Sequence, residues 1–390
     1  MNTLAPWPYY AEDEIAGVTN VLKSGKVNYW TGSECREFEK EYAAYVGVPY
    51  AVAMMNGTVT MEAALYALGV GEGDEVIVPS HTFIATASSV VMCGATPIVA
   101  DISTQSNNIT IDTIKAIFTK RTKAIIVVHL AGWPCDMDPI MQFAEEHNLK
   151  VIEDCAQAHG ARYKGRPVGS IGHISSFSFC QDKIISTGGE GGMVLTADED
   201  LWRKMWELKD HGKSYEAVYH REHQPGFRWV HESFGTNFRM TEVQAVIGRK
   251  QLQKLNSWVE TRRAHAHYLI NCFKSLPAIR IETPPADIYH AYYKLYVYLR
   301  LDKLKSDWPR DRVIQAINAK GAPCFWGGSS EIYREKAFTE SAFAIHERYP
   351  NAKLQGETAM VFLVHPTLTE ADIKQVGEVV TQVLRQATAK

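Results

Sequence analysis

The sequence predicts an α/β protein with a mostly parallel, doubly wound sheet, followed by a smaller α+β unit. Short apolar runs alternate with helical patterns between residues 50 and 154, as they do in repeated strand–helix–strand units. Small or polar residues follow several of the expected strands, and ligands of such sheets bind beyond the carboxyl ends of the strands. From about residue 251 a long amphipathic pattern and several prolines replace the alternation. We therefore expect a large domain over 1–250 and a smaller one over 251–390.

Composition excludes several classes of protein. The 390 residues include 41 basic and 44 acidic side chains, a net charge of −3, which gives no reason to expect nucleic acid or an anionic membrane as a partner. There is no run of 18 apolar residues and no signal-peptide pattern, so we expect no membrane segment. Seven scattered cysteines without a CxxC pair suit reduced thiols. We therefore expect a cytoplasmic protein.

The elements of the first unit follow in order. Residues 8–25 have a helical pattern, SGKVNYWTG (24–32) interrupts it, and Ser33 is expected to cap the next helix. The expected strands are Tyr50–Met55, Glu75–Val78, 96–102, Thr122–Val128, Leu149–Glu153, Ile174–Phe179 and Met193–Leu195. Helices are expected between them over 61–68, within 79–94, and over 111–118 and 139–147.

The stretch GHISSFSFCQDKIISTGGEGGMVLT (172–196) contains a lysine in an unusual place. Lys183 follows an expected strand, has Ile184 and Ile185 after it, and precedes two pairs of glycines. Desolvation lowers the pKa of a lysine and makes the neutral amine available as a nucleophile for a Schiff base. From this stretch alone, a surface lysine beside a hairpin turn is the better interpretation.

Polar residues after the expected strands point to one crevice. Asn56-Gly57-Thr58 is a turn between a strand and a helix start, where free backbone N–H groups suit a phosphate. His81-Thr82-Phe83 and Asp154 follow other strands directly. A carboxylate after four apolar residues is costly to bury without a cationic partner, although an Asp that hydrogen-bonds the following turn is common. Because these residues share the carboxyl edge of the sheet, we expect them to converge.

Together these motifs resemble the DegT/DnrJ/EryC1/StrS family of pyridoxal-phosphate-dependent sugar aminotransferases, a branch of the fold-type I (aspartate aminotransferase-like) enzymes. The similar segments run nearly end to end. They include FEKEYAAYVGVPYAVAMMNGT, GDEVIVPSHTFIATASSV, VIEDCAQAHGA, SFSFCQDKIISTGGEGGMV and FGTNFRMTEVQAVIGRKQL. Such a resemblance implies the fold and the cofactor, pyridoxal 5'-phosphate (PLP), more directly than it implies the substrate.

The resemblance assigns a role to individual residues. Lys183 matches the lysine that forms a Schiff base with PLP and then moves a proton. Asp154 matches the carboxylate that pairs with the ring nitrogen and keeps the ring an electron sink. Gln157 matches a residue near the phenolic oxygen, and Phe83 matches the aromatic side chain stacked on the ring. Residues at phosphate-binding positions are Gly57, Thr58, Ser178 and, from the neighbouring subunit, Asn237. The resemblance therefore implies a homodimer with shared active sites.

Two positions at which members of the family differ bear on activity. The phosphate turn is often Ser-Gly-Thr, and the Asn56-Gly57-Thr58 turn is expected to leave backbone N–H donation intact. Relatives that have histidine in place of the lysine are dehydratases, so the presence of Lys183 favours transamination.

The second unit is expected to contain an amphipathic helix over 251–273, an alternating strand over 292–301, a helix over 310–319, and elements at 356–364 and 370–387. Residues 323–338 are expected to form a loop. Its aromatic residues Trp326 and Tyr333 would either stack on a nucleotide base or pack the domain interface.

Residues 220–232, HREHQPGFRWVHE, contain three histidines whose spacing fits no tetrahedral zinc set, so we expect no metal site. We expect a polar loop that helps to cover the active site, because it directly precedes Asn237. The candidates for binding the substrate are Arg228, His231, Arg239 and Trp326.

These observations predict a PLP-dependent aminotransferase that moves an amino group from L-glutamate to a nucleotide-linked keto sugar. The resemblance favours C4 of a UDP- or dTDP-linked 4-keto-6-deoxyhexose over a 3-keto sugar, for O-antigen or another bacterial surface polysaccharide. One alternative is a PLP-binding regulator of the same fold without catalysis, which the set Lys183, Asp154 and Gln157 argues against. The other is a nucleotide-binding α/β protein, which the absence of GxGxxG and GxxxxGK[ST] argues against.

Overall fold

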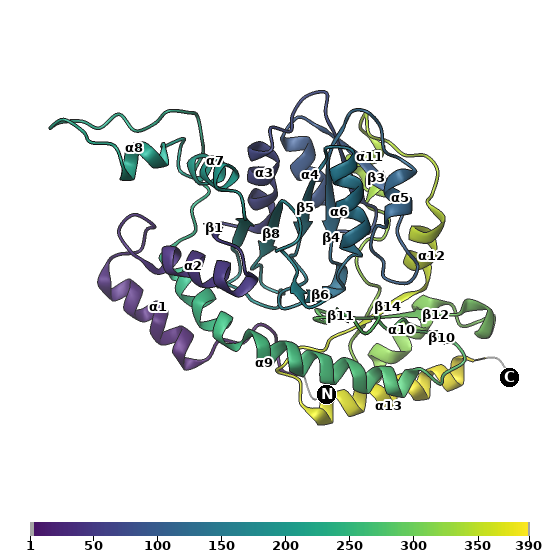
Figure 1. The fold of residues 1–390 in the computed structure, drawn as a ribbon. Coiled ribbons are helices and arrows are strands. Elements are labelled where there is room, and N and C mark those ends of the chain that lie inside the picture. The colour runs from purple at the N-terminus through teal and green to yellow at the C-terminus, as the bar shows by residue number, and fades with distance from the viewer. Residues whose placement is uncertain (1–3, 389–390) are drawn as a thin grey trace.

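The computed structural model describes residues 4–388, which contain a large sheet, a smaller sheet and a short third sheet (Figure 1). The large sheet has seven strands in the order β1-β9-β8-β5-β4-β2-β3. All neighbouring pairs are parallel except those of β9, which runs antiparallel to both β1 and β8. The mostly parallel sheet expected from the sequence is thereby confirmed. Its strands are β1 (Tyr50–Met54), β2 (Glu75–Pro79), β3 (Thr96–Ala100), β4 (Thr122–Val128), β5 (Lys150–Asp154), β8 (Ile174–Ser178) and β9 (Gly192–Thr196).

Helices cover both faces of this sheet, because its strands carry apolar side chains on both faces. On β1, Val52 and Met54 pack in one hydrophobic cluster with α3, α4 and α7, whereas Ala51 and Ala53 pack in another with α2 and with α9 (Glu242–Phe273). Further along the sheet, α6 packs over β4 and β5. The helices of this unit are α1 (Glu12–Ser24), α2 (Glu34–Val46), α3 (Gly57–Ala67), α4 (Ala85–Met92), α5 (Ile111–Lys115), α6 (Met137–Glu146), α7 (Glu199–Lys209) and α8 (Tyr215–Tyr219).

The N-terminus of α2 is capped by a distant residue. Ser33 occupies the capping position, but its side chain forms no capping hydrogen bond. Instead the buried carboxylate of Glu242 accepts hydrogen bonds from the backbone N–H groups of Glu34 and Cys35. The expectation that Ser33 caps this helix is therefore wrong, because a carboxylate more than 200 residues away supplies the stronger acceptor.

The second sheet has four antiparallel strands, with α9 (Glu242–Phe273) and α13 (Glu370–Ala387) packed side by side beneath it (Figure 1). Helix α9 begins at Glu242 rather than near 251, and its first turns contact α1 and α2. The boundary that we propose near 250 therefore falls inside one continuous helix. The remaining elements are β10 (Ile279–Arg280), β12 (Leu295–Leu299), α10 (Arg310–Ala319), β13 (Cys324–Phe325), α11 (Lys336–Thr339), α12 (Pro350–Thr358) and β14 (Ala359–Phe362).

Residues 323–338 are more ordered than the loop expected from the sequence, because they include β13, a 3-10 turn over Ile332–Arg334 and α11. Tyr333 is buried in the cluster that α3, α4 and α7 form with one face of the large sheet, whereas Trp326 is 46% exposed. For Tyr333, the second interpretation holds, because its side chain packs at an interface between the two halves of the chain.

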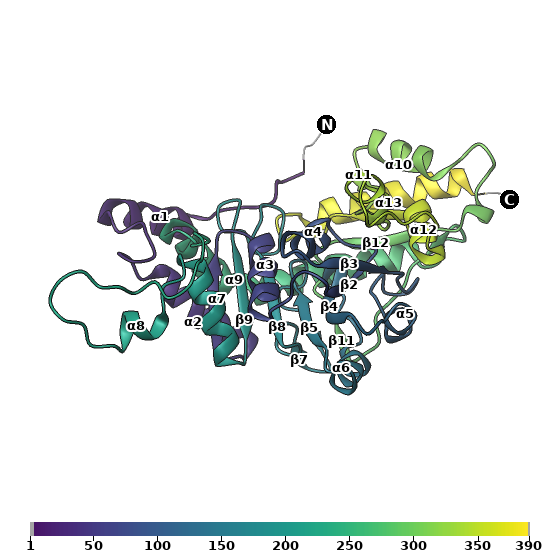
Figure 2. The ribbon, with the colours of Figure 1, turned by 90° about the horizontal axis from the view of Figure 1, so that it is seen from above.

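Residues 213–236, which we call the arm, include α8 and extend away from the body of the molecule next to α7 (Figures 1 and 2). A small third sheet of two-residue strands joins β6 (Arg162–Tyr163), β7 (Arg166–Pro167) and β11 (Ile288–Tyr289). Within residues 4–388, no helix is both long enough and apolar enough to cross a membrane.

Candidate active site

Residues from three strands of the large sheet, β1, β5 and β8, meet at its carboxyl edge. Asp154 ends β5 and lies beside Ser176 of β8, and Ser178 ends that strand. Gly57 begins α3 directly after β1, and a Cβ atom on it would lie 2.6 Å from the Cβ of Ser178. Only a glycine allows the turn to approach Ser178 this closely. The convergence expected for the phosphate turn and Asp154 is therefore present in the structure.

Asp154 is a buried carboxylate with no salt bridge in the described part of the chain. Its side chain is 5% exposed, Oδ2 accepts a hydrogen bond from Thr86 Oγ1 at 3.0 Å, and Oδ1 accepts one from the Ala156 N–H at 3.1 Å. Burial raises the pKa of Asp154, and these two donors and the charge of Lys183 offset only part of that effect. Such a carboxylate fits a cationic N–H donor, as a protonated PLP ring nitrogen is.

Lys183 is only half-buried, although Ile184 and Ile185 after it are fully buried. Its Nζ atom lies over the ring of Tyr293, 5.3 Å from the ring centroid, and its backbone carbonyl accepts a hydrogen bond from Trp7 Nε1 at 2.8 Å. Tyr293 belongs to the segment before β12, so the second half of the chain forms one wall around this lysine. Lys183 therefore lies at an accessible edge rather than in a closed apolar pocket.

Phe83 and Gln157 lie after β2 and β5. The Phe83 side chain is 70% exposed, which is unusual for a large apolar residue at the edge of a sheet and leaves it open to stack on a planar ring. Gln157 is half-buried, and its Oε1 atom accepts a hydrogen bond from the Ala131 N–H at 2.7 Å. Ala131 has a φ of 54°, a left-handed conformation that is uncommon outside glycine.

The phosphate turn differs from expectation in one respect. The side chain of Asn56 caps α3, because its Oδ1 atom accepts hydrogen bonds from the N–H groups of Thr58 and Val59, both at 3.0 Å. The expectation of free donors at this helix terminus is therefore wrong for these two groups. A phosphate bound here would compete with the asparagine oxygen for the Thr58 N–H.

The remaining predicted residues lie apart from this cluster or already have partners. Asn237 is exposed and lies opposite Asp210 in an antiparallel bridge. Arg239 pairs with buried Asp210 at 2.9 Å. The guanidinium of Arg228 donates to the carbonyl of Val218 at 2.9 Å, His231 is exposed on the arm, and Trp326 Nε1 donates to Asp311 Oδ1 at 2.9 Å. The structure does not bring these candidates together, and their role in binding the substrate stays a prediction.

Sequence reasoning missed two buried polar residues around the site, His159 and Thr86, and assigned no task to Thr82. His159 bridges the hydroxyl of Tyr42, 2.7 Å from Nδ1, and the carbonyl of Ser178, 2.9 Å from Nε2, and burial lowers the pKa of His159 to about 3. The neutral ring thus holds the end of β8 in place. Thr82 and Thr86 contact each other behind Asp154. Their i, i+4 spacing within HTFIATAS was a signal that could have revealed them.

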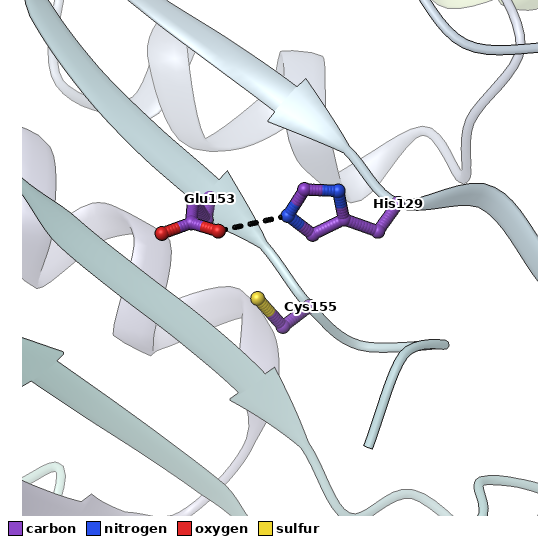
Figure 3. Close-up of side chains that lie close together, drawn as sticks. All are labelled: His129, Glu153 and Cys155. Atoms are coloured by element: carbon purple, nitrogen blue, oxygen red, sulfur yellow. Dashed lines mark hydrogen bonds and ion pairs between the residues drawn. The ribbon is translucent and has the colours of Figure 1, made fainter. Parts of the chain in front are cut away.

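His129, Glu153 and Cys155 form a buried cluster whose side chains are close enough to hold a metal ion (Figure 3). However, His129 Nε2 lies 2.9 Å from Glu153 Oε2, and His129 Nδ1 accepts the Cys135 N–H at 3.0 Å. Glu153 also accepts hydrogen bonds from the backbone N–H groups of Gly169, Ile171 and Gly172. Burial alone would raise the pKa of Glu153, but His129 and these donors bring it below its ordinary value. The His129 and Glu153 side chains therefore already have partners, and Glu153 ties β5 to the segment that precedes β8.

Comparison with known proteins agrees with this arrangement. The model of the DegT/DnrJ/EryC1/StrS aminotransferase family matches residues 8–381. GDP-perosamine synthase from Caulobacter vibrioides is 38% identical over 349 residues, 89% of each chain. UDP-N-acetyl-3-dehydro-alpha-D-glucosamine 3-aminotransferase from Acidithiobacillus ferrooxidans is 37% identical over 379 residues, 95% of this chain and 94% of that protein.

Among solved structures, the aminotransferase from Psychrobacter cryohalolentis is 54% identical and superimposes with a TM-score of 0.97 over 98% of this chain and 99% of that one. This similarity extends to both halves of the chain and confirms the fold-type I architecture expected from the sequence motifs. The chain belongs to the DegT/DnrJ/EryC1/StrS aminotransferase family and is a PLP-dependent sugar-nucleotide aminotransferase.

Proposed function

We propose that this enzyme transfers the amino group of L-glutamate to C4 of a UDP- or dTDP-linked 4-keto-6-deoxyhexose, for the synthesis of a bacterial surface glycan such as O-antigen. The observation that carries the cofactor part of the proposal is the buried carboxylate of Asp154, which accepts two hydrogen bonds but forms no salt bridge within residues 4–388. The preference for C4 rests on the resemblance of the sequence motifs.

The residues at the carboxyl edge each have a proposed task. PLP, when bound, supplies an electron sink for the carbon that carries the transferred nitrogen. Asp154 would hold the proton on the ring nitrogen, Phe83 would cover one face of the ring, and Gln157 would interact with the phenolic oxygen. Lys183 Nζ would hold the cofactor and would move a proton at the substrate carbon. Gly57, Thr58 and Ser178 would bind the phosphate.

A second candidate is amination at C3. The printed name of the Acidithiobacillus relative specifies a 3-dehydro sugar and a 3-amino product, and that protein matches nearly the full length of this chain. We therefore keep a 3-keto sugar nucleotide as the alternative acceptor, and the choice between the two acceptors is made by experiment.

We also propose a homodimer in which the arm contacts the second subunit and Asn237 reaches the phosphate of the neighbouring site. Phe227, Trp229 and Phe234 on the arm are 76%, 81% and 99% exposed. Large apolar side chains that are this exposed on one segment support burial against a second copy. Phe234 lies three residues before Asn237, so the same contact would place the asparagine. All seven cysteines are free, which supports our proposal of a cytoplasmic location.

The test is a visible spectrum of the purified PLP-bound enzyme recorded in two steps. L-glutamate is added first, and we expect the band of the lysine-bound cofactor to disappear. UDP-, dTDP- and GDP-linked 4-keto-6-deoxy sugars are then added in parallel with 3-keto sugars, and the band returns with the true acceptor. Return with a 3-keto sugar alone would contradict amination at C4. Loss of the band with no acceptor restoring it would contradict the sugar substrates proposed here.

A further inference from the structure

We propose that Thr86 is a positioning residue that orients the Asp154 carboxylate toward the cofactor ring, and that Thr82 in turn aligns the hydroxyl of Thr86. This inference rests on the proposed role of Asp154 at the ring nitrogen. It concerns how the chain holds that carboxylate in the productive geometry.

The three side chains form a continuous hydrogen-bonded row inside the protein. Thr82 Oγ1 lies 2.7 Å from Thr86 Oγ1, and Thr86 Oγ1 lies 3.0 Å from Asp154 Oδ2. Thr82 is 5% exposed, Thr86 is 1% exposed and Asp154 is 5% exposed, so water competes little for these contacts. The row connects the start of α4 to the end of β5.

The chemistry of the groups determines the direction of the row. An ionised carboxylate only accepts hydrogen bonds, so the single O–H of Thr86 must donate to Asp154. The contact between the threonines is then made by the O–H of Thr82, which donates to Thr86. Both donors point toward Asp154, and this arrangement stabilises its charged form.

Thr86 is the only side chain of residues 4–388 that hydrogen-bonds to Asp154, and the other donor is the Ala156 backbone N–H. These two bonds engage one lone pair on each carboxylate oxygen and fix the plane of the group, leaving other lone pairs for a ligand. The same short segment carries Phe83, so one turn would set both the ring-stacking side chain and the orientation of the carboxylate.

The test compares Thr86→Val with Thr86→Ser in the full-length protein, with PLP affinity of the apoenzyme measured across pH. We expect Thr86→Val to weaken PLP binding near neutral pH by about tenfold to one-hundredfold, the range for loss of one hydrogen bond to a charged group. Loss of the donor raises the pKa of Asp154 further. As pH is lowered, PLP affinity should therefore begin to fall at a higher pH in Thr86→Val than in the parent. Thr86→Ser retains the hydroxyl and restores the parent profile.

Two further variants separate positioning from general stability. Ser89→Ala removes a buried hydroxyl of the same helix, which donates to the Thr86 carbonyl at 3.1 Å, and should leave the pH profile unchanged. Thr82→Val should weaken PLP binding less than Thr86→Val does. In the double variant the loss of PLP affinity should equal that of Thr86→Val alone, because Thr82 acts through Thr86. Lys183 and His129, whose charges also act on Asp154, are unchanged in every variant.

An unshifted pH profile of PLP affinity in Thr86→Val would overturn the inference. So would an equal loss of PLP affinity in Ser89→Ala, since either result indicates a structural role alone. These outcomes differ from failure of the proposed function. If the parent enzyme binds PLP but Asp154→Asn binds and turns over equally well, the role of Asp154 is wrong and the positioning inference falls with it.

Discussion

Asn56 Oδ1 accepts a hydrogen bond from the Thr58 N–H at 3.0 Å, so the chain's own side chain occupies a donor that we assign to the cofactor phosphate. An N-cap residue normally stabilises its helix by satisfying such donors. Here the cap satisfies two donors of the protein without cofactor, and a phosphate bound as we propose would displace it at Thr58.

This relationship predicts a stability effect that depends on the cofactor. Asn56→Ala should destabilise the apoenzyme by about 1 kcal/mol, as loss of an N-cap does. With PLP bound the loss should be smaller, because phosphate then accepts from the helix N-terminus. Thermal unfolding of both forms, with and without PLP, measures the difference, and equal destabilisation of the two forms would contradict the competition.

Replacement of the proposed catalytic lysine should abolish turnover and leave the fold intact. We expect Lys183→Ala to lower activity by at least about 10²–10⁴-fold, the contribution of one positioned proton-transfer group. The matched control is Lys294→Ala, because Lys294 is a half-buried lysine that pairs with Asp182 nearby at 3.3 Å. Steady-state rates and circular dichroism of both variants provide the measurement. Activity of Lys183→Ala near the parent rate would refute the assignment.

Asp154→Asn should have opposite effects on activity and stability. Turnover should fall by about 10²-fold or more even when PLP is supplied at saturating concentration, because a neutral amide no longer holds the ring nitrogen protonated. The apoenzyme should become more stable by on the order of 1 kcal/mol at neutral pH, since the variant removes a buried charge without a cationic partner.

The pH dependence of this effect follows from the sign of the shift. Burial raises the pKa of Asp154 above its unfolded value, so its carboxylate destabilises the folded apoenzyme once pH rises above the ordinary aspartate range. The gain from Asp154→Asn should therefore shrink as pH falls through the raised pKa toward that range. Unfolding free energies measured from acidic to neutral pH test this, and a gain that is constant with pH would contradict it.

The exposed apolar residues of the arm should be required for the dimer. We expect Phe234→Ser to shift the protein toward monomer and to lower activity most strongly in dilute solution, where subunits separate. Met92→Ser is the control, because Met92 is also highly exposed, at 73%, but lies at the end of α4. Sedimentation velocity over a range of concentrations measures both. A Phe234→Ser dimer as stable as the parent would disprove the proposed contact.

Local sequence patterns predicted most of the α/β unit. The apolar runs of β2, β4 and β5 were recognisable because strands covered on both faces are apolar throughout. The convergence of Gly57 and Asp154 followed from the rule that parallel strands end at one edge. Several helix bounds moved, and α3 begins at Gly57 rather than 61 because Asn56 caps it.

What the sequence by itself determined about this protein is its order of strands and helices, its family and the identity of the residues at the sheet edge. Only the tertiary structure decided which groups form polar contacts: the Glu242 carboxylate caps α2, Thr86 donates to Asp154, and Arg239 pairs with Asp210. The physical reason is the separation of the partners along the sequence. Strand and helix patterns arise from neighbours a few residues apart, whereas these polar contacts join residues 29 to 208 positions apart and form only when the sheet and helices pack.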